Sequence, residues 1–294
     1  MIGKALSKAL LNKGYQIIIL SRKDQQSTQK NLQYARWNIE KGYIDENAIR
    51  DADYVVHLAG ANLGIGRWTK KKKKLFTESR VRSGDLLTQS LNNIPNKVRA
   101  VISASAIGYY GADKDGPGRA FIETDKPDNH FLGNLVQQWE GAVQPLNAFK
   151  RLVILRFGMV ISSEGGAYPE FKAPVKWGVC PVLGKGNQVV SWIYIDDAVR
   201  LIISSIEDDK LNGVYNGVAP NPISNKLLMK TIGKYVNRYC ISVPVPALII
   251  QLMYGEKSIE VLKSATVSSD KVRKVGFELL YPDIDSAIRK LVAS

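Results

Sequence analysis

Cysteine and histidine are scarce in this sequence, which has two of each among its 294 residues. Cys180 and Cys240 stand alone, without metal-type spacing and without the several pairs of a disulfide framework. Clusters of His, Cys, Asp and Glu with the spacing of metal ligands are also missing. We therefore predict a protein that binds no metal and works with reduced thiols in the cytoplasm.

Long apolar runs are missing as well. The best stretch, 243–253, is broken by Pro244 and Pro246 and is much shorter than the ~20 apolar residues that span a bilayer. The N-terminus lacks the basic and then apolar pattern of a secretory signal. Both absences predict that the protein has no membrane partner.

Acidic residues are few relative to basic ones. The chain has 41 Lys and Arg against 27 Asp and Glu, which gives a formal net charge of +14. Such a charge attracts nucleic acid, acidic membranes or phosphorylated ligands, or it belongs to a lysine-rich, solvated surface. The densest run is Lys70–Lys74, and basic residues interleaved with aromatics are absent elsewhere. The solvated surface is the simpler interpretation, so we expect no nucleic-acid partner.

Short apolar runs alternate with longer amphipathic stretches, a pattern typical of a parallel sheet covered by helices. After Pro220 helical segments dominate and no strong strand pattern appears. We predict an α/β fold, a Rossmann-type doubly wound parallel sheet over residues 1–222, followed by a small, mainly helical C-terminal subdomain over 223–294. The expected strands are 15–20, 54–58, 98–104, 152–157 and 189–193, and the expected helices are 2–12, 45–50, 69–91, 131–149 and 196–206.

The first predicted helix has an unusual position in the chain. A Rossmann unit runs strand, glycine turn, helix, strand, with the pyrophosphate on the N-terminus of the helix. This sequence opens on the helix itself, and Gly3 occupies the place of the last glycine of the fingerprint. We expect that the first strand and the earlier glycines are absent from the recorded sequence, and we interpret Met1 as an internal methionine.

The ends of two predicted strands indicate the cofactor. Ser21 and Arg22 follow the second strand of the Rossmann unit, where NAD-specific proteins usually carry an acidic residue. A guanidinium there favours the 2′-phosphate of NADP, which it can bind with two hydrogen bonds. Ala59 and Gly60 follow the next strand, and such small residues let a ligand approach the backbone. The sequence therefore predicts an NADP site.

A series of motifs in a fixed order resembles one known family. Together they resemble the atypical "epimerase family protein" branch of the short-chain dehydrogenase/reductase superfamily, proteins of the NAD-dependent epimerase/dehydratase type with a C-terminal domain of unknown function. The resemblance covers nearly the whole chain, and it implies that Arg80 joins the cofactor site and that Phe157, Met159 and Val160 approach the nicotinamide. The motifs are 53–62 (DYVVHLAGAN), 67–69 (RWT), 79–81 (SRV), 103–111 (SASAIGYYG), 139–140 (WE), 191–197 (SWIYIDD) and 216–222 (NGVAPNP).

Members of this superfamily usually move a proton with a tyrosine and a lysine four residues later, and a glutamate often follows the lysine by four. Counting back from Glu140 places Val136 and Leu132 at these positions, and the whole segment 131–138 contains neither Tyr nor Lys. The remaining candidates for catalysis are Ser105, Tyr109 and Tyr110, which follow the strand 98–104. The alternative is that Ser105 only caps a turn and that the two tyrosines pack in the loop.

Three functions remain open on these grounds. The first is an NADP-dependent oxidoreductase or nucleotide-sugar epimerase that acts on a small-molecule substrate with an altered proton donor. The second is a non-catalytic NADP-binding regulator, related to cell division by the naming of the family, and the missing tyrosine–lysine pair motivates it. A third, nucleic-acid binding through the basic surface, is the least favoured.

Overall fold

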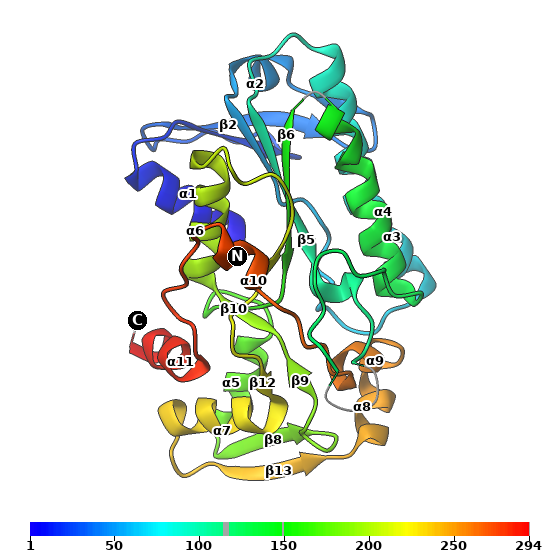
Figure 1. Ribbon diagram of the computed structural model, residues 1–294, viewed down its shortest axis with the longest axis vertical. Coiled ribbons are helices and arrows are strands. Elements are labelled where there is room, and N and C mark those ends of the chain that lie inside the picture. The colour runs from blue at the N-terminus through cyan, green and yellow to red at the C-terminus, as the bar shows by residue number, and fades with distance from the viewer. Residues whose placement is uncertain (114–117, 149, 294) are drawn as a thin grey trace.

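A computed structural model describes residues 1–113, 118–148 and 150–293 (Figure 1). Its centre is a parallel sheet in the order β11-β6-β5-β4, with α3 and α4 on one face and α1 and α6 on the other. This arrangement confirms the predicted Rossmann-type α/β fold. The elements of this part are β4 (Tyr54–His57), β5 (Ala100–Ala106), β6 (Arg151–Phe157), β11 (Gly213–Gly217), α1 (Ile2–Asn12), α2 (Glu46–Asp51), α3 (Lys70–Asn93), α4 (Phe131–Val143) and α6 (Ile195–Glu207), with 3-10 turns at Ile107–Tyr109 and Gln144–Ala148. Phe149, the expected end of the helix that begins at 131, lies outside the described residues.

A second, smaller sheet has the order β1-β2-β3, with β1 (Ile17–Ser21) parallel to β2 (Leu32–Asn38) and β3 (Tyr43–Ile44) antiparallel to β2. β1 and β4 are therefore end strands of two separate sheets. Leu20 of β1 and Val55 of β4 nevertheless pack against the same apolar cluster under α3. The expectation that a first strand and earlier glycines are absent from the recorded sequence stays a prediction.

The helix α1 ends as its sequence predicts. Gly14 has φ +86°, the left-handed conformation that glycine adopts without steric cost. The amide of Tyr15 donates to the carbonyl of Leu10 and the amide of Gly14 to that of Leu11, which satisfies carbonyl groups that the helix leaves open. The chain then enters β1 directly.

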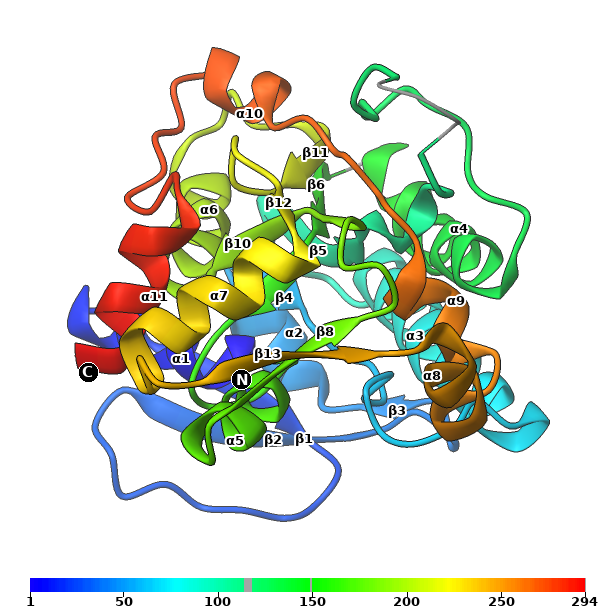
Figure 2. The same ribbon diagram turned by 90° about the horizontal axis from the view of Figure 1, so that it is seen from below.

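The lower part of the molecule combines segments from both halves of the sequence. Figure 2 shows α7 against the parallel pair of β8 and β13, and α5 also packs on α7 and β8. The expected lack of strands after Pro220 is wrong. β13 contains Pro244, and proline is tolerated because this strand pairs on one side only and is mostly exposed. The elements are β7 (Met159–Ile161), α5 (Tyr168–Lys176), β8 (Val179–Leu183), β9 (Val189–Val190), β10 (Trp192–Tyr194), β12 (Ile223–Ser224), α7 (Asn225–Val236), β13 (Ile241–Val245), α8 (Ala247–Tyr254), α9 (Lys257–Leu262), α10 (Asp270–Lys274) and α11 (Ile284–Ala293).

The two cysteines form a disulfide, which corrects the prediction of isolated thiols. Cys180 lies on β8 and Cys240 directly precedes β13, and their Cα atoms are 5.8 Å apart. The pairing of β8 with β13 brings the cysteines together across 60 residues of sequence. The expectation of a reducing compartment was based on reduced thiols, so the sequence no longer supports it.

Two absences concern the described residues alone. No described helix is both long and apolar enough to cross a membrane. The same residues bring together no group of three or more His, Cys, Asp or Glu side chains that could hold a metal ion.

Candidate functional site

The N-terminus of α1 lies beside the loop that follows β4. A Cβ atom added to Gly3 would be 3.7 Å from Cδ1 of Leu58, the residue before Ala59. This is ordinary van der Waals contact, so a small side chain would fit at position 3. The free amide groups of the first turn of α1 and the loop residues Ala59 and Gly60 thus share one edge of the sheet, which is where Rossmann-type proteins bind a pyrophosphate.

Arg80 of α3 packs directly on the backbone of this loop. A Cβ atom on Gly60 would be 2.8 Å from the guanidinium carbon of Arg80, so no other residue fits there without displacing the arginine. Nη1 of Arg80 donates to the carbonyl groups of Ala61 and Phe76, both at 3.1 Å, and the guanidinium lies 5.0 Å from the ring centre of Trp139. Its Nε is buried without a partner among the described residues. Burial lowers the pKa of Arg80 to about 10, which still leaves it charged at neutral pH.

Ser21 and Arg22 lie at the carboxyl end of β1, as predicted. The hydroxyl of Ser21 accepts hydrogen bonds from the Lys23 amide and from Nε2 of Gln25, both at 3.1 Å, while Arg22 is exposed. The parallel register places Arg36 of β2 next to Ser21. The sequence did not single out Arg36, because 32–38 mixes polar and apolar residues. Arg36 forms an ion pair with Asp24 at 3.0 Å, so Arg22 is the basic side chain at the end of β1 that is left for a ligand phosphate.

Phe157, Met159 and Val160 lie where β6 passes into β7. The amide of Met159 donates to the Ser191 carbonyl at 3.0 Å, and β7 pairs with β10 in parallel register. A side chain on Gly158 would clash with the Ser191 carbonyl, at 2.6 Å, so the two strands approach closely only because residue 158 is glycine. Phe157 is buried, whereas Met159 and Val160 are half-buried. Their role at a nicotinamide stays a prediction.

His57, at the end of β4, is a packed residue. Its Nε2 lies 2.9 Å from the Ser83 hydroxyl and its Nδ1 3.3 Å from the Ser103 hydroxyl. Burial, and to a smaller extent the charge of Arg80, lowers the pKa of His57 to about 4. The imidazole is therefore neutral at physiological pH and bridges α3 and β5.

We expect this histidine to make the fold sensitive to acid. The unfolded chain binds a proton at an ordinary pKa of 6.5 and the folded chain only near 4, so stability falls as the pH drops through this window. The loss attributable to His57 is about 3 kcal/mol in the free energy of unfolding. Urea unfolding of wild type and of His57→Gln between pH 7 and pH 4 measures it. Identical pH dependence in the two proteins would contradict this assignment, since exposed His130 is present in both.

A buried ion pair lies below the carboxyl end of β5. Glu140 of α4 binds Nε and Nη2 of Arg156 on β6, both at 2.8 Å, and it also accepts the hydroxyl of Ser105 at 2.5 Å. The side chains of Arg156 and Glu140 are only 4% and 11% exposed. Burial lowers the pKa of Arg156, but its hydrogen bonds and ion pair with Glu140 outweigh that effect and raise the pKa above its ordinary value. The Ser105 hydroxyl thus donates a hydrogen bond to an ion pair that is buried in the core.

Tyr110 belongs to the same network. Its hydroxyl donates to Oδ1 of Asn216 at 2.8 Å and accepts from Nη1 of Arg156 at 3.0 Å. The residue is completely buried, and burial raises the pKa of Tyr110 to about 12 against the lowering effect of Arg156 and Asn216. Glu123 also takes part in this network, because its carboxylate accepts a hydrogen bond from the backbone amide of Asn216 at 2.9 Å.

Tyr109 differs from its neighbour. Its ring covers the guanidinium of Arg156, with 3.5 Å between the guanidinium carbon and the ring centre, and it meets the Tyr110 ring edge-on at 5.4 Å. Tyr109 is half-buried, and no hydrogen bond of its hydroxyl is found among the described residues. The three predicted catalytic residues are therefore brought together around Arg156. Of the two tyrosines, only Tyr109 has a hydroxyl without a hydrogen-bond partner in the described part of the chain.

The residues that organise this network were not predicted as site residues. Glu140 served only to locate the tyrosine–lysine positions, and the expectation for the strand that ends at Phe157 did not include Arg156. A usable signal was present, because Arg156 is a charged residue between Leu155 and Phe157 in an apolar strand, and a buried charge requires a partner. α4 carries Leu132 and Val136, and their assignment to the positions of the usual tyrosine and lysine stays a prediction.

Comparison with known proteins agrees with this architecture. The model of the NAD-dependent epimerase/dehydratase family matches residues 1–216, and a domain of unknown function, DUF1731, matches residues 245–291. An epimerase family protein of Staphylococcus saprophyticus is 35% identical over 99% of this chain and 96% of its own length. The crystal structure of human epimerase family protein SDR39U1, isoform 2, with NADPH has a TM-score of 0.88 at 24% identity and covers 100% of this chain and 96% of that one. A nucleoside-diphosphate sugar epimerase from Corynebacterium glutamicum has a TM-score of 0.77 at 27% identity, covering 100% of this chain and 56% of that one.

The family model covers more than two thirds of the chain, and the bacterial relative extends the similarity to almost all of it. The ordered motifs, the sheet topology and the loop geometry around Gly60 are consistent with both. The chain therefore belongs to the NAD-dependent epimerase/dehydratase family, in the branch of epimerase family proteins that carry a C-terminal DUF1731 domain.

Proposed function

We propose that this protein is an NADP-dependent oxidoreductase or nucleotide-sugar epimerase that acts on a small-molecule substrate. The observations that carry the proposal are the exposed Arg22 at the carboxyl end of β1 and the packing of Arg80 on the Gly60 loop that follows β4. The human relative whose structure contains NADPH supports the choice of cofactor. Bound NADP would supply a nicotinamide that accepts or donates a hydride.

The residues at these two strand ends fit a dinucleotide that carries a 2′-phosphate. Arg22 offers an exposed guanidinium for that phosphate, beside the Ser21 hydroxyl. Gly60 leaves room for the guanidinium of Arg80 against the loop, and Nε of Arg80 is a hydrogen-bond donor without a partner among the described residues. Together these groups would hold the pyrophosphate and neutralise part of its charge.

Tyr109 is the residue that we propose to exchange a proton with the substrate oxygen. Arg156 holds the ring from one side and Tyr110 from its edge, so the phenol is fixed in direction. Ser105 and Tyr110, whose hydroxyls are engaged with Glu140 and Asn216, act as positioning residues for Arg156. Tyr109 thus takes the part that a tyrosine on α4 plays elsewhere in the superfamily.

Replacing Arg22 by alanine is expected to weaken NADPH binding by about 10- to 100-fold, since charge-assisted hydrogen bonds contribute roughly 1.5–3 kcal/mol. NADH lacks the phosphate, so its affinity should change less than twofold. Fluorescence titration of both nucleotides measures the two constants. Lys8→Ala, which removes an exposed charge of α1, is the matched control. An equal loss of affinity for NADPH and NADH in Arg22→Ala would show that this arginine does not bind the 2′-phosphate.

A non-catalytic, NADP-binding regulator is the second candidate. It is favoured by the occupied hydroxyls of Ser105 and Tyr110 and by Leu132 and Val136 on α4, which cannot transfer protons. The two functions predict different results in an assay of NADPH consumption. Steady consumption of NADPH with carbonyl compounds or sugar nucleotides, lost in Tyr109→Phe, supports the enzyme, whereas tight NADPH binding without consumption supports the regulator.

A further inference from the structure

A band of exposed apolar side chains crosses the lower end of the molecule. The strand β13 and the helix α8 lie at the lower end of Figure 1 and on the near side of Figure 2, where one follows the other. Contiguous apolar surface of more than a few hundred Å² usually marks an interaction site. The apolar band consists of Trp177, Ile241, Val243, Leu248, Leu252 and Met253, which are between 41% and 89% exposed.

The helix α8 is the most unusual part of this band. Its sequence, ALIIQLMY, has no charged residue, and of these eight residues, all of them described, only Ile250 is buried. Leu248 and Leu252 are one helical turn apart and Met253 follows Leu252, so the three side chains lie toward the same side of the helix. A helix that is apolar on all sides normally lies inside a protein or a membrane. The exposure of α8 therefore indicates a binding partner.

The strand β13 does not favour pairing with a strand of another chain. The Ile241 amide donates to the Gly178 carbonyl at 2.9 Å. The Val245 carbonyl accepts from the Gly184 amide, also at 2.9 Å, so both residues direct their backbone groups toward β8. Residues between them face the free edge of the strand, and among these Pro244 has no amide to donate. Proline at a free edge disfavours strand addition, so a partner would contact the side chains.

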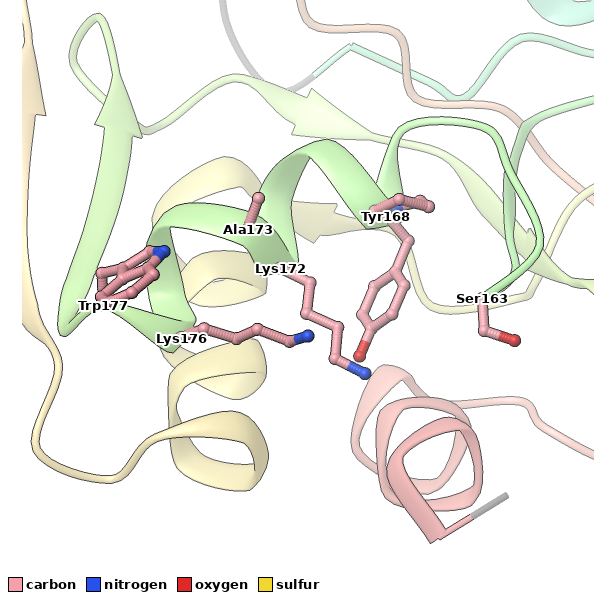
Figure 3. A pocket seen from close by; sticks show the side chains of 7 residues that line it. Ser163, Tyr168, Lys172, Ala173, Lys176 and Trp177 are labelled. Carbon is pink, nitrogen blue, oxygen red and sulfur yellow. The ribbon is translucent and has the colours of Figure 1, made fainter.

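Trp177 forms the other end of the apolar band. It lies where α5 passes into β8, and at 89% exposure it is the most exposed large apolar residue in the described part of the chain. Val179, two residues later, pairs in register with Ile241 at the start of β13. Figure 3 shows Trp177 at the end of α5, with Lys172 and Lys176 on the same helix. Tryptophan is enriched where a bilayer meets water, because its ring is apolar and its N–H group is polar.

The segments that form and surround the band are basic. Residues 54–77, 171–195 and 210–255 contain no Asp or Glu, whereas they contain six, three and five Lys and Arg, respectively. The first segment includes the start of α3, the second includes β8, and the third includes α7, β13 and α8. A surface with this charge pattern attracts anionic ligands.

The basic start of α3 lies next to the end of α8. Lys73 forms an ion pair with Glu256, which directly follows the glycine that ends α8. A Cβ atom on that glycine, Gly255, would be 3.2 Å from Nε of Arg67. Arg67 and the run Lys70–Lys74 are therefore beside the apolar band, and the carboxylate of Glu256 is already paired. Apolar and cationic side chains thus occur together on one side of the molecule.

We propose that this side of the protein binds the surface of an anionic phospholipid bilayer. The apolar band enters the boundary between headgroups and acyl chains, and the basic side chains around it contact the lipid phosphates. Binding at the surface requires neither a spanning helix nor a signal, the two absences on which the expectation of no membrane partner was based. The surface shares no residue with the proposed NADP site, so the inference goes beyond the proposed function.

A second copy of the chain is the main alternative partner. Two copies that met through the apolar band would bring the same basic segments face to face, and like charges across an interface are unfavourable. A bilayer instead offers phosphates of the opposite charge. It also requires no complementary shape, which suits the protruding side chains of α8.

Co-sedimentation of the full chain with sucrose-loaded vesicles tests the proposal. Vesicles of phosphatidylcholine and phosphatidylglycerol in equal parts should bind the chain at least about tenfold more tightly than vesicles of phosphatidylcholine alone. Leu248→Gln with Leu252→Gln should weaken binding about 30-fold or more, because two leucine side chains no longer leave water. Lys70→Gln with Lys71→Gln should weaken it about 10- to 30-fold. All four residues are exposed, so the melting temperature should change by less than about 2 °C.

Each double variant has a matched control. Leu280→Gln changes a leucine that is 57% exposed and lies outside the band. Lys30→Gln with Lys41→Gln removes two exposed charges that flank β2, at the upper end of Figure 1. Both controls should leave vesicle binding within about twofold of wild type.

Three results would overturn the proposal. The first is the absence of binding to either kind of vesicle at about 1 mM accessible lipid. The second is a loss of binding in the control variants as large as in the band variants, which would reduce the effect to overall charge and hydrophobicity. The third is a dimer in solution that dissociates in Leu248→Gln with Leu252→Gln while wild type binds no vesicles, which would assign the band to a second copy.

Discussion

Arg156→Met is expected to lower the free energy of unfolding by about 3–5 kcal/mol. The arginine is almost inaccessible, and it is bound by both oxygens of Glu140. Removing it leaves a carboxylate enclosed by α4, β5 and β6 with only the Ser105 hydroxyl as a donor among the contacts described above. A buried charge without its partner is much more costly than the same pair removed together. Urea unfolding of the whole protein measures the loss.

Two further variants separate the buried charge from other effects of the substitution. The double variant Glu140→Gln with Arg156→Met removes both charges and should recover about half or more of the lost stability. Arg82→Met makes the same substitution at an ion pair with Glu78 on the exposed side of α3, where side chains are 55% and 34% exposed, and should cost less than about 1 kcal/mol. Similar losses in Arg156→Met and Arg82→Met would show that water reaches the inner pair.

The network around Arg156 also shows which parts of the site could be predicted from the sequence and which could not. The strand ends that carry Ser21, Ala59 and Ser105 could be found because apolar runs mark strands, and the edge of a parallel sheet follows from its connectivity. The contacts of Glu140 with Arg156 could not be found in this way. They join a helix to a strand by side chains 16 residues apart, and no periodicity records which buried charges face one another.

The C-terminal part was predicted less well for a related reason. β13 has the sequence Ile241–Val245 with a proline inside, and proline normally argues against a strand. It is tolerated here because β13 pairs with β8 alone, a partner about 60 residues earlier in the chain. The same long-range pairing brings the two cysteines together. Local sequence patterns indicate the secondary structure that a segment prefers on its own. This strand instead forms because it pairs with β8, which is distant in sequence.

Reduction of the Cys180–Cys240 disulfide should lower the free energy of unfolding by about 4 kcal/mol. The bond closes a loop of 60 residues, and the loss of unfolded-chain entropy for a loop of this length corresponds to that value. The bond joins β8 to the start of β13, so reduction should first loosen the exposed strand β13. Urea unfolding with and without a phosphine reductant measures the difference, after partial denaturation has given the reagent access to buried Cys180.

The contribution of the cross-link to the free energy of unfolding can be separated from that of the packing of the two cysteine side chains. In the double variant Cys180→Ala with Cys240→Ala, reductant should have no effect on the unfolding midpoint, since both cysteines of the chain are gone. The stability of this variant relative to reduced wild type then reports the packing of the two side chains against Gly233 of α7. Protein purified without reductant should show no reactive thiol after denaturation. Two reactive thiols in that sample would contradict the bond, and β8 and β13 would then be held together by their hydrogen bonds and by the core beneath them alone.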